Sequence, residues 1–209
     1  MFIPYVNLKK QWKEERKYLL PIIDKILASG DYVGGNEVEK FEKNVCKKFN
    51  TKFSVSLNSG TDALTLSLHT IGIKKGDEVI TTPNSFIAST SVIIHLGARP
   101  VFVDVNKDQN ININKIENAI TKKTKAIMPV HLTGRMCEMD SIMQIAKKYG
   151  LAVIEDAAQS IGSKYIDKFS GNYGNIGCFS THPLKNLNAS GDGGFITTNN
   201  KILYSKIKS

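Results

Sequence analysis

The sequence has little cysteine and no long hydrophobic run. Three cysteines occur among 209 residues, and they lack any C-x-x-C spacing, so neither a disulfide framework nor a zinc site is predicted. No apolar stretch approaches the roughly 20 residues of a membrane span, and the N-terminus lacks the basic-then-apolar order of a signal peptide. The sequence therefore predicts no membrane association and favours a cytoplasmic location.

Clustered positive charge is also absent. The net charge is +9, yet the lysines are dispersed as Lys-Lys pairs, without a basic block and without interleaved aromatic residues. Proteins that bind nucleic acid usually concentrate such residues on one face. We therefore predict no nucleic-acid partner. No H-x-x-x-H spacing or Cys/His cluster indicates a metal site.

Two helical patterns come first in the chain. Apolar side chains recur at helical spacing over residues 7–29 and stop at Gly30, and a second helical pattern starts near Asn36. We expect residues 1–52 to form an N-terminal helical arm that carries no chemistry of its own.

From residue 53 onward, short apolar runs alternate with helical stretches. Strand patterns occupy residues 53–57, 79–82, 101–105, 126–130, 151–154, 177–180 and 195–198. Such alternation predicts an α/β domain over residues 53–209, with a mainly parallel sheet flanked by helices. In this class of fold, functional sites lie at the carboxyl ends of the strands.

Lys185 is the most suggestive nucleophile in the sequence. It follows Ser180 by five residues and precedes a glycine-rich segment, residues 191–194. A lysine amine becomes a useful nucleophile when its pKa is lowered or when it forms an imine with a carbonyl cofactor, usually pyridoxal 5'-phosphate (PLP). PLP also needs an acid for its ring nitrogen, a flat group against its ring and donors for its phosphate.

Two other strand ends supply candidates for these needs. Asp156 follows strand 151–154, where a carboxylate would keep the ring nitrogen of PLP protonated, although it could also cap a following helix. Gln159 could hydrogen-bond the 3'-oxygen of the ring. Gly60 and Thr61 stand at a predicted helix N-terminus, which suits a phosphate but is also the pattern of an ordinary helix cap.

Other positions leave a functional and a structural interpretation open. Phe86 could lie flat on a pyridine ring, but its spacing favours a place in the core. Ser180 could give a hydroxyl to the phosphate or be a surface serine. His131 could line the pocket, although a hydrogen-bonded core histidine is the better interpretation, and His182 is interpreted as shaping its loop.

Together, these residues resemble the N-terminal part of the DegT/DnrJ/EryC1/StrS family of PLP-dependent nucleotide-sugar aminotransferases. The motifs occur in family order along the whole chain. They are Gly30-Asp-Tyr-Val-Gly-Gly35, Ser59-Gly-Thr-Asp-Ala-Leu64, Gly76-Asp-Glu-Val-Ile80, Val103-Asp104, Pro129-Val-His-Leu-Thr-Gly134, Glu155-Asp-Ala-Ala-Gln159, Phe179-Ser-Thr-His-Pro-Leu-Lys-Asn-Leu187 and Gly191-Asp-Gly-Gly194.

The resemblance implies the large domain of a fold type I PLP-dependent aminotransferase. Family members are nearly twice as long, so the small C-terminal domain is expected to be missing, and whether the chain is a fragment or a truncated product stays open. Matched positions imply Lys185 as the catalytic Schiff-base lysine. The implied cofactor contacts are Asp156 at the ring nitrogen, Gln159 at the 3'-oxygen, Phe86 on the ring face, and Gly60, Thr61 and Ser180 at the phosphate.

The resemblance also implies a reaction, in which an amino group moves from glutamate to a keto-sugar nucleotide during amino-sugar biosynthesis for a polysaccharide or glycan. It implies a homodimer in the full-length form, and residues 185–194 resemble members acting at the sugar 3-position more than those acting at the 4-position. The alternative is a truncated, non-catalytic remnant that binds PLP or a sugar nucleotide. A nicotinamide oxidoreductase is disfavoured because no G-x-G-x-x-G links a strand to a helix.

Overall fold

The structure, a computed structural model, describes residues 3–4, 6–31 and 33–209. The chain divides into two compact units, residues 1–41 and 42–209. Tyr32 of the first family motif lies outside the described residues. The sequence predicts a boundary between the N-terminal arm and the main domain at residue 52. The division into compact units does not test that boundary, which stays a prediction.

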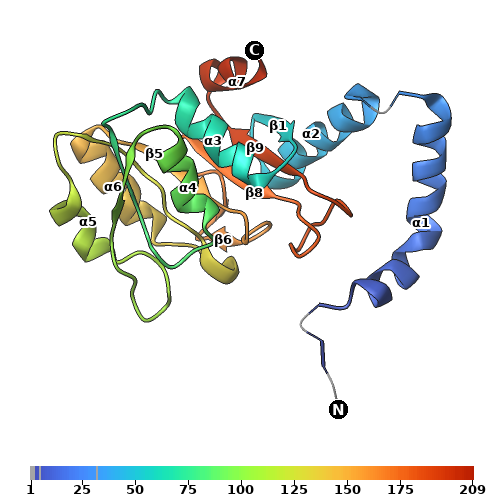
Figure 1. Ribbon diagram of the computed structural model, residues 1–209, viewed down its shortest axis with the longest axis horizontal. Coiled ribbons are helices and arrows are strands. Elements are labelled where there is room, and N and C mark those ends of the chain that lie inside the picture. Colours follow the sequence, from blue (N-terminus) through green and yellow to red (C-terminus); the bar gives the residue numbers. More distant parts are fainter. Residues whose placement is uncertain (1–2, 5, 32) are drawn as a thin grey trace. The chain divides into compact units, whose positions relative to one another are not determined.

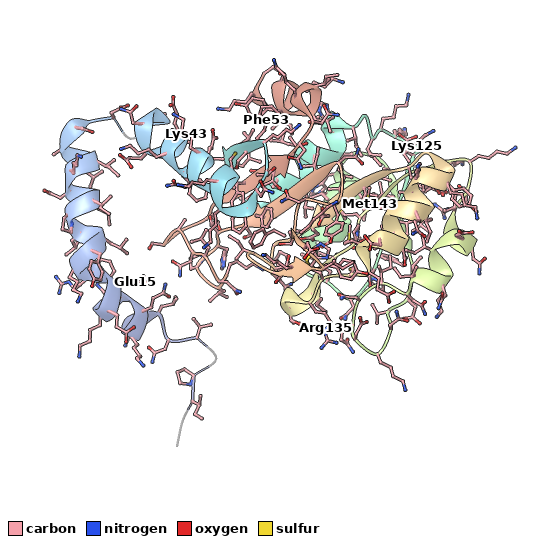
Figure 2. The ribbon with its side chains drawn as sticks, turned by 180° about the vertical axis from the view of Figure 1, so that it is seen from behind. Glu15, Lys43, Phe53, Lys125, Arg135 and Met143 are labelled. Atoms are coloured by element: carbon pink, nitrogen blue, oxygen red, sulfur yellow. The ribbon has the colours of Figure 1, made fainter. Side chains whose placement is uncertain are left out.

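The first unit consists of helix α1 (Leu8–Ser29) and the beginning of helix α2 (Gly35–Phe49). Asn7 caps α1, because its side chain accepts the Lys10 N–H, and the helix ends at Gly30 in the left-handed conformation that favours glycine. No residue of α1 is buried, and its side chains, Glu15 among them, are drawn in Figure 2. Both helices begin within a residue or two of the predicted positions.

A seven-stranded sheet forms the centre of residues 42–209, in the order β1-β9-β8-β5-β4-β2-β3. Strands β1, β9 and β8 of this sheet are labelled in Figure 1. Its strands are β1 (Phe53–Leu57), β2 (Glu78–Thr81), β3 (Arg99–Phe102), β4 (Thr124–Ile127), β5 (Ala152–Asp156), β8 (Ile176–Ser180) and β9 (Gly194–Thr198). The five strands from β8 to β3 pair in parallel, whereas β9 runs antiparallel to both β1 and β8. The predicted mainly parallel α/β fold is confirmed, with one reversed strand.

Helices cover the sheet on both faces. They are α3 (Gly60–Thr70), α4 (Ala88–His95), α5 (Ile113–Ala119), α6 (Met139–Tyr149) and α7 (Lys201–Lys208). Successive strand residues point to opposite faces, so Val153 packs with the α5 and α6 cluster while Ile154 packs with the α3 and α4 cluster. The sheet therefore separates two hydrophobic cores, and each core fixes one layer of helices.

Two features were not predicted. A short 3-10 turn occupies Leu132–Gly134, and an antiparallel hairpin joins β6 (Lys164–Tyr165) to β7 (Lys168–Phe169). Strands of two residues are too short to show an alternating pattern in the sequence. Within the described residues, no helix combines the length and the apolar character needed to cross a bilayer.

The sheet brings segments that are distant in the sequence to one end of its strands. In the register of β1, β9 and β8, Gly194 lies opposite both Leu57 and Ser180, so the ends of β1 and β8 flank the beginning of β9. Asp156, the last residue of β5, lies opposite Cys178 of β8. The residues that follow these strands therefore share one end of the sheet.

Candidate active site

One cavity of about 570 Å³ gathers every site residue predicted from the sequence. These residues are Gly60, Thr61, Phe86, Asp156, Gln159, Ser180 and Lys185. They come from four separate strand ends, as expected for a parallel sheet whose sites lie at the carboxyl edge. The structure thus brings the predicted residues together, while their roles stay predictions.

The N-terminus of α3 forms one end of the cavity. Ser59 caps this helix, because its Oγ accepts the Asp62 N–H at 3.0 Å. The N–H groups of Gly60 and Thr61 belong to the first turn, where a helix offers no internal acceptor. An anion placed there would meet open donors and the positive end of the helix dipole.

Gly60 also allows an unusually close approach between α3 and β8. A Cβ atom built on Gly60 would lie 2.6 Å from the Cβ of Ser180, closer than real Cβ contacts allow. Ser180 is half-buried, and its Oγ accepts the His182 N–H at 3.3 Å. The glycine therefore brings the Ser180 hydroxyl beside the helix N-terminus, as a phosphate cradle requires.

Asp156 lies at the buried wall of the cavity, with 5% of the residue exposed. Its Oδ2 accepts the Ser89 hydroxyl at 2.6 Å, and its Oδ1 accepts the Ala158 N–H at 3.2 Å. A turn follows β5 rather than a helix, so the helix-capping alternative for Asp156 is wrong. Both carboxylate oxygens keep lone pairs available for a further donor.

Burial raises the pKa of the Asp156 carboxyl above its usual range. Hydrogen bonds from Ser89 and Ala158 oppose this rise, and so does the positive charge of Lys185. Lys185, which is half-buried, thus acts electrostatically on the acid across the cavity. A cationic group bound between them would be a further partner for this carboxylate.

Gln159 and Phe86 line other parts of the cavity. The Gln159 Oε1 accepts the Thr133 N–H at 3.1 Å, which leaves the side-chain amide free to donate. Phe86 is 68% exposed, so the core position that its spacing favoured is wrong. An exposed ring at the mouth of a cavity can instead lie against a bound ligand.

The two histidines differ in position. His131 is fully buried, with Nε2 at 3.0 Å from Glu155 Oε2, and its Nδ1 accepts the Cys137 N–H, which confirms a hydrogen-bonded core histidine. His182 lines the cavity, and its Nδ1 accepts the Leu184 N–H at 3.2 Å, so it also shapes the loop that carries Lys185.

Three residues of this region were not found by sequence reasoning. Ser85 and Ser89 line the cavity, and their hydroxyl oxygens lie 2.7 Å apart. Glu155 is completely buried and accepts, besides His131, three backbone N–H groups of residues 171–174 at 2.7–2.8 Å. Ser89 and Asp156 are 67 positions apart, and no motif spacing connects them.

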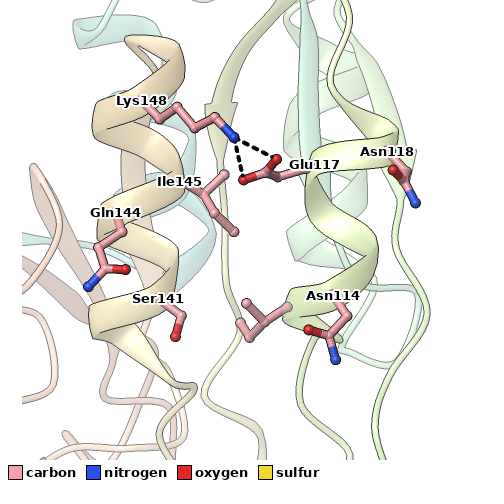
Figure 3. Close-up of a pocket in the computed structure, with 8 residues that line it drawn as sticks. Asn114, Glu117, Asn118, Ser141, Gln144, Ile145 and Lys148 are labelled. Carbon is pink, nitrogen blue, oxygen red and sulfur yellow. Dashed lines mark hydrogen bonds and ion pairs between the residues drawn. The ribbon is translucent and has the colours of Figure 1, made fainter.

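A second hollow lies on the surface between α5 and α6 (Figure 3). Its charged groups pair with each other, because Lys148 donates to both carboxylate oxygens of Glu117 at 3.1 and 2.9 Å. Amide side chains such as Asn114 and Gln144 complete its lining. No predicted site residue faces this hollow, so the candidate chemistry belongs to the cavity around Lys185.

Comparison with known proteins is consistent with this geometry. The family model described as the DegT/DnrJ/EryC1/StrS aminotransferase family matches residues 13–209. The chain is 43% identical, over 207 residues, to a UDP-N-acetyl-3-dehydro-alpha-D-glucosamine 3-aminotransferase of Acidithiobacillus ferrooxidans, covering 99% of this chain and 56% of that protein. The chain spans about half the length of the curated relatives it matches.

Solved structures show the same similarity. NtdA of Bacillus subtilis, with the cofactor PMP bound, superposes with a TM-score of 0.93 at 36% identity, covering 98% of this chain and 47% of that one. The PLP form of the putative sugar aminotransferase Spr1654 of Streptococcus pneumoniae gives a TM-score of 0.86 at 31% identity, covering 90% and 54%. Both neighbours hold a form of the cofactor for which the cavity residues were predicted.

Proposed function

Because this chain belongs to the DegT/DnrJ/EryC1/StrS aminotransferase family, we propose that it carries the PLP-binding part of an enzyme that moves an amino group from glutamate to a keto-sugar nucleotide. The observation that carries the proposal is the cavity shared by Lys185, Asp156 and the N-terminus of α3. The relative from Acidithiobacillus, by its name, acts on a UDP-linked 3-dehydro sugar, which supports the substrate class.

The residues present fit the cofactor. Gly60 leaves space that a Cβ would fill, and the open N–H groups there and the Ser180 hydroxyl suit a phosphate. The partly satisfied carboxylate of Asp156 suits a protonated ring nitrogen, and the free amide of Gln159 suits the 3'-oxygen. When bound, PLP would supply an electron sink for the carbon from which a proton is removed.

The protein's own groups then have definite tasks. Asp156 would keep the ring nitrogen of the cofactor protonated, and Phe86 would cover one face of the ring and exclude water from it. The Nζ of Lys185 would be the amine that holds the cofactor, and it would be placed to accept and return a proton. Burial of Asp156 strengthens its attraction to a positive ring because few water molecules compete.

The proposal also covers the amino donor, the oligomeric state and the cellular location. We infer glutamate as the amino donor, a homodimer in the full-length form and a cytoplasmic location, all implied by the family resemblance. Size-exclusion chromatography with light scattering measures the assembly of the full-length form. Paired assays with 3-keto and 4-keto nucleotide sugars would show which carbon receives the amino group.

The test uses purified protein mixed with PLP. We expect an absorption band from the bond between Lys185 and the cofactor, and glutamate should convert the bound cofactor to its amine form. Lys185→Ala should abolish both signals, whereas Lys201→Ala, at an exposed lysine of α7, should leave them unchanged. An unchanged spectrum in Lys185→Ala would overturn the proposal.

A second candidate function is a cofactor-binding remnant without transamination. The chain spans 56% of the Acidithiobacillus enzyme, so this candidate concerns what the 209 residues do by themselves. In that case PLP would give the Lys185-dependent band, but glutamate would leave the band unchanged. The half-reaction therefore separates the two candidates.

A further inference from the structure

A pair of serine hydroxyls lies directly behind the carboxylate of Asp156. Ser89, on α4, is 1% exposed, and its Oγ donates to Asp156 Oδ2 at 2.6 Å. The Oγ of Ser85, which lies four residues earlier and before the start of α4, is 2.7 Å from the Oγ of Ser89. Ser85, Ser89 and Asp156 all line the candidate active-site cavity.

The direction of this chain follows from the number of protons available. A serine hydroxyl has one proton to donate, and Ser89 gives its proton to Asp156. Ser85 must therefore be the donor in its contact with Ser89. Ser85 therefore donates to Ser89, and Ser89 donates to Asp156. This direction suits an ionised Asp156 carboxylate, because such a group can only accept hydrogen bonds.

We propose that Ser89, supported by Ser85, is a positioning residue that holds the Asp156 carboxylate in the orientation needed to receive a positively charged ring nitrogen. This inference rests on the proposed function, because it assigns Ser89 a task at the same site. The donor atoms from Ser89 and Ala158 fix one oxygen each, so the carboxylate cannot rotate without losing a hydrogen bond. Each carboxylate oxygen then keeps one lone pair, in a fixed direction, for the ligand.

The hydroxyl pair also affects the charge of Asp156. A hydrogen bond to the charged form favours that form, and the Ser89 hydroxyl opposes the rise in the Asp156 pKa that burial causes. The other ionisable groups around Asp156 are Lys185, His131, the Cys178 thiol opposite it in β8, and Glu155 beside it. None of these groups changes in a Ser89 variant.

The main test needs no cofactor. Apoprotein labelled with ¹³C at the aspartate carboxyl carbon is titrated, and the Asp156 resonance is assigned with Asp156→Asn. We expect Ser89→Ala to move the Asp156 midpoint upward, because the ionised form loses a donor. Ser85→Ala should move it upward by less. The control is Ser91→Ala on the same helix. The Ser91 Oγ donates to the Ala88 carbonyl and not to Asp156, so its removal should not move the Asp156 midpoint.

An Asp156 midpoint in Ser89→Ala equal to that of the wild type would overturn the inference, and so would an equal shift in Ser91→Ala. Should Ser89→Ala fail to fold, the Ser85→Ala titration decides, because Ser85 is only half-buried. Failure of the proposed function is distinguishable, since the apoprotein titration is informative even if PLP never binds.

A second measurement follows the ligand. We expect the dissociation constant for PLP, measured by equilibrium dialysis, to rise about tenfold in Ser89→Ala, as loss of a hydrogen bond to a charged group implies. Ser89→Thr keeps the hydroxyl and should restore the Asp156 midpoint. Unchanged PLP affinity in Ser89→Ala would count against a positioning role.

Discussion

The buried carboxylate of Asp156 makes the apoprotein less stable than it could be. A charge removed from water is unfavourable unless its partners compensate, and here the partners are neutral donors and a distant lysine. Because the pKa of Asp156 is raised in the folded state, the folded protein binds more protons than the unfolded chain in the interval between the two pKa values. Stability therefore falls as the pH rises through this interval.

From this we predict that Asp156→Asn stabilises the apoprotein at neutral pH. The melting temperature should rise by roughly 2–4 °C, which corresponds to about 1 kcal/mol for a chain of this size. The asparagine amide can donate to Ser89, whose hydroxyl then turns toward Ser85, so no buried group loses its partner. Thermal melts between about pH 4 and 8 should show the difference shrinking on acidification. An equal or lower melting temperature at neutral pH would contradict this reasoning.

Gly60 supports a second prediction at the level of single residues. Gly60→Ala adds a methyl group 2.6 Å from the Ser180 Cβ, so α3 and β8 must separate and the proposed phosphate cradle should open. We expect PLP affinity to fall by roughly tenfold or more, equivalent to about 1.4 kcal/mol. The matched control is Gly191→Ala, where a Cβ meets nothing within 4 Å. Equilibrium dialysis of both variants measures the effect, and equal affinities would rule out the cradle.

At the scale of secondary structure, the positions of the elements along the chain could be predicted from the sequence. The direction of β9 and the contact between α4 and the end of β5 could not. An alternating apolar pattern predicted β1 to the residue, because burial and periodicity are local properties of the sequence. The direction of β9 depends on which neighbour it pairs with, and no local pattern records that choice. The contact between Ser89 and Asp156 was missed for the same reason, since only the folded sheet brings α4 to the end of β5.

The β6–β7 hairpin gives a prediction about an element. Ile166 lies at its turn with φ 52°, a left-handed conformation that is costly for a β-branched residue, and it is 66% exposed. Asparagine tolerates this conformation, so Ile166→Asn should stabilise the protein by about 1 kcal/mol. Ile202→Asn serves as the control, because Ile202 is 68% exposed but lies in helix α7. Urea unfolding that shows no gain for Ile166→Asn, or the same gain for both variants, would refute the strain argument.

At the scale of the whole molecule, stability is unevenly distributed. The two hydrophobic cores belong to residues 42–209, whereas no residue of α1 is buried. A helix without a buried face depends on its own propensity, which is marginal in water for isolated helices. The single tryptophan, Trp12, lies on α1 and is 42% exposed.

Trp12 fluorescence should therefore report on α1 rather than on the sheet. We expect its thermal transition to differ from the transition seen by circular dichroism, because the two probes follow parts of the chain with different burial. Trp12→Phe should leave the circular dichroism transition within about 0.5 kcal/mol of the wild type. Coincident transitions for both probes would show that α1 unfolds together with the cores.

The reversed direction of β9 has a practical consequence. β8 ends and β9 begins at the same edge of the sheet, so the segment carrying Lys185, residues 181–193, leaves and re-enters the fold at neighbouring points. This segment can therefore be lengthened or shortened without a change in the order or direction of any strand. Transplanting this loop between related proteins would exchange Lys185 and its surroundings while the strands beneath stay intact.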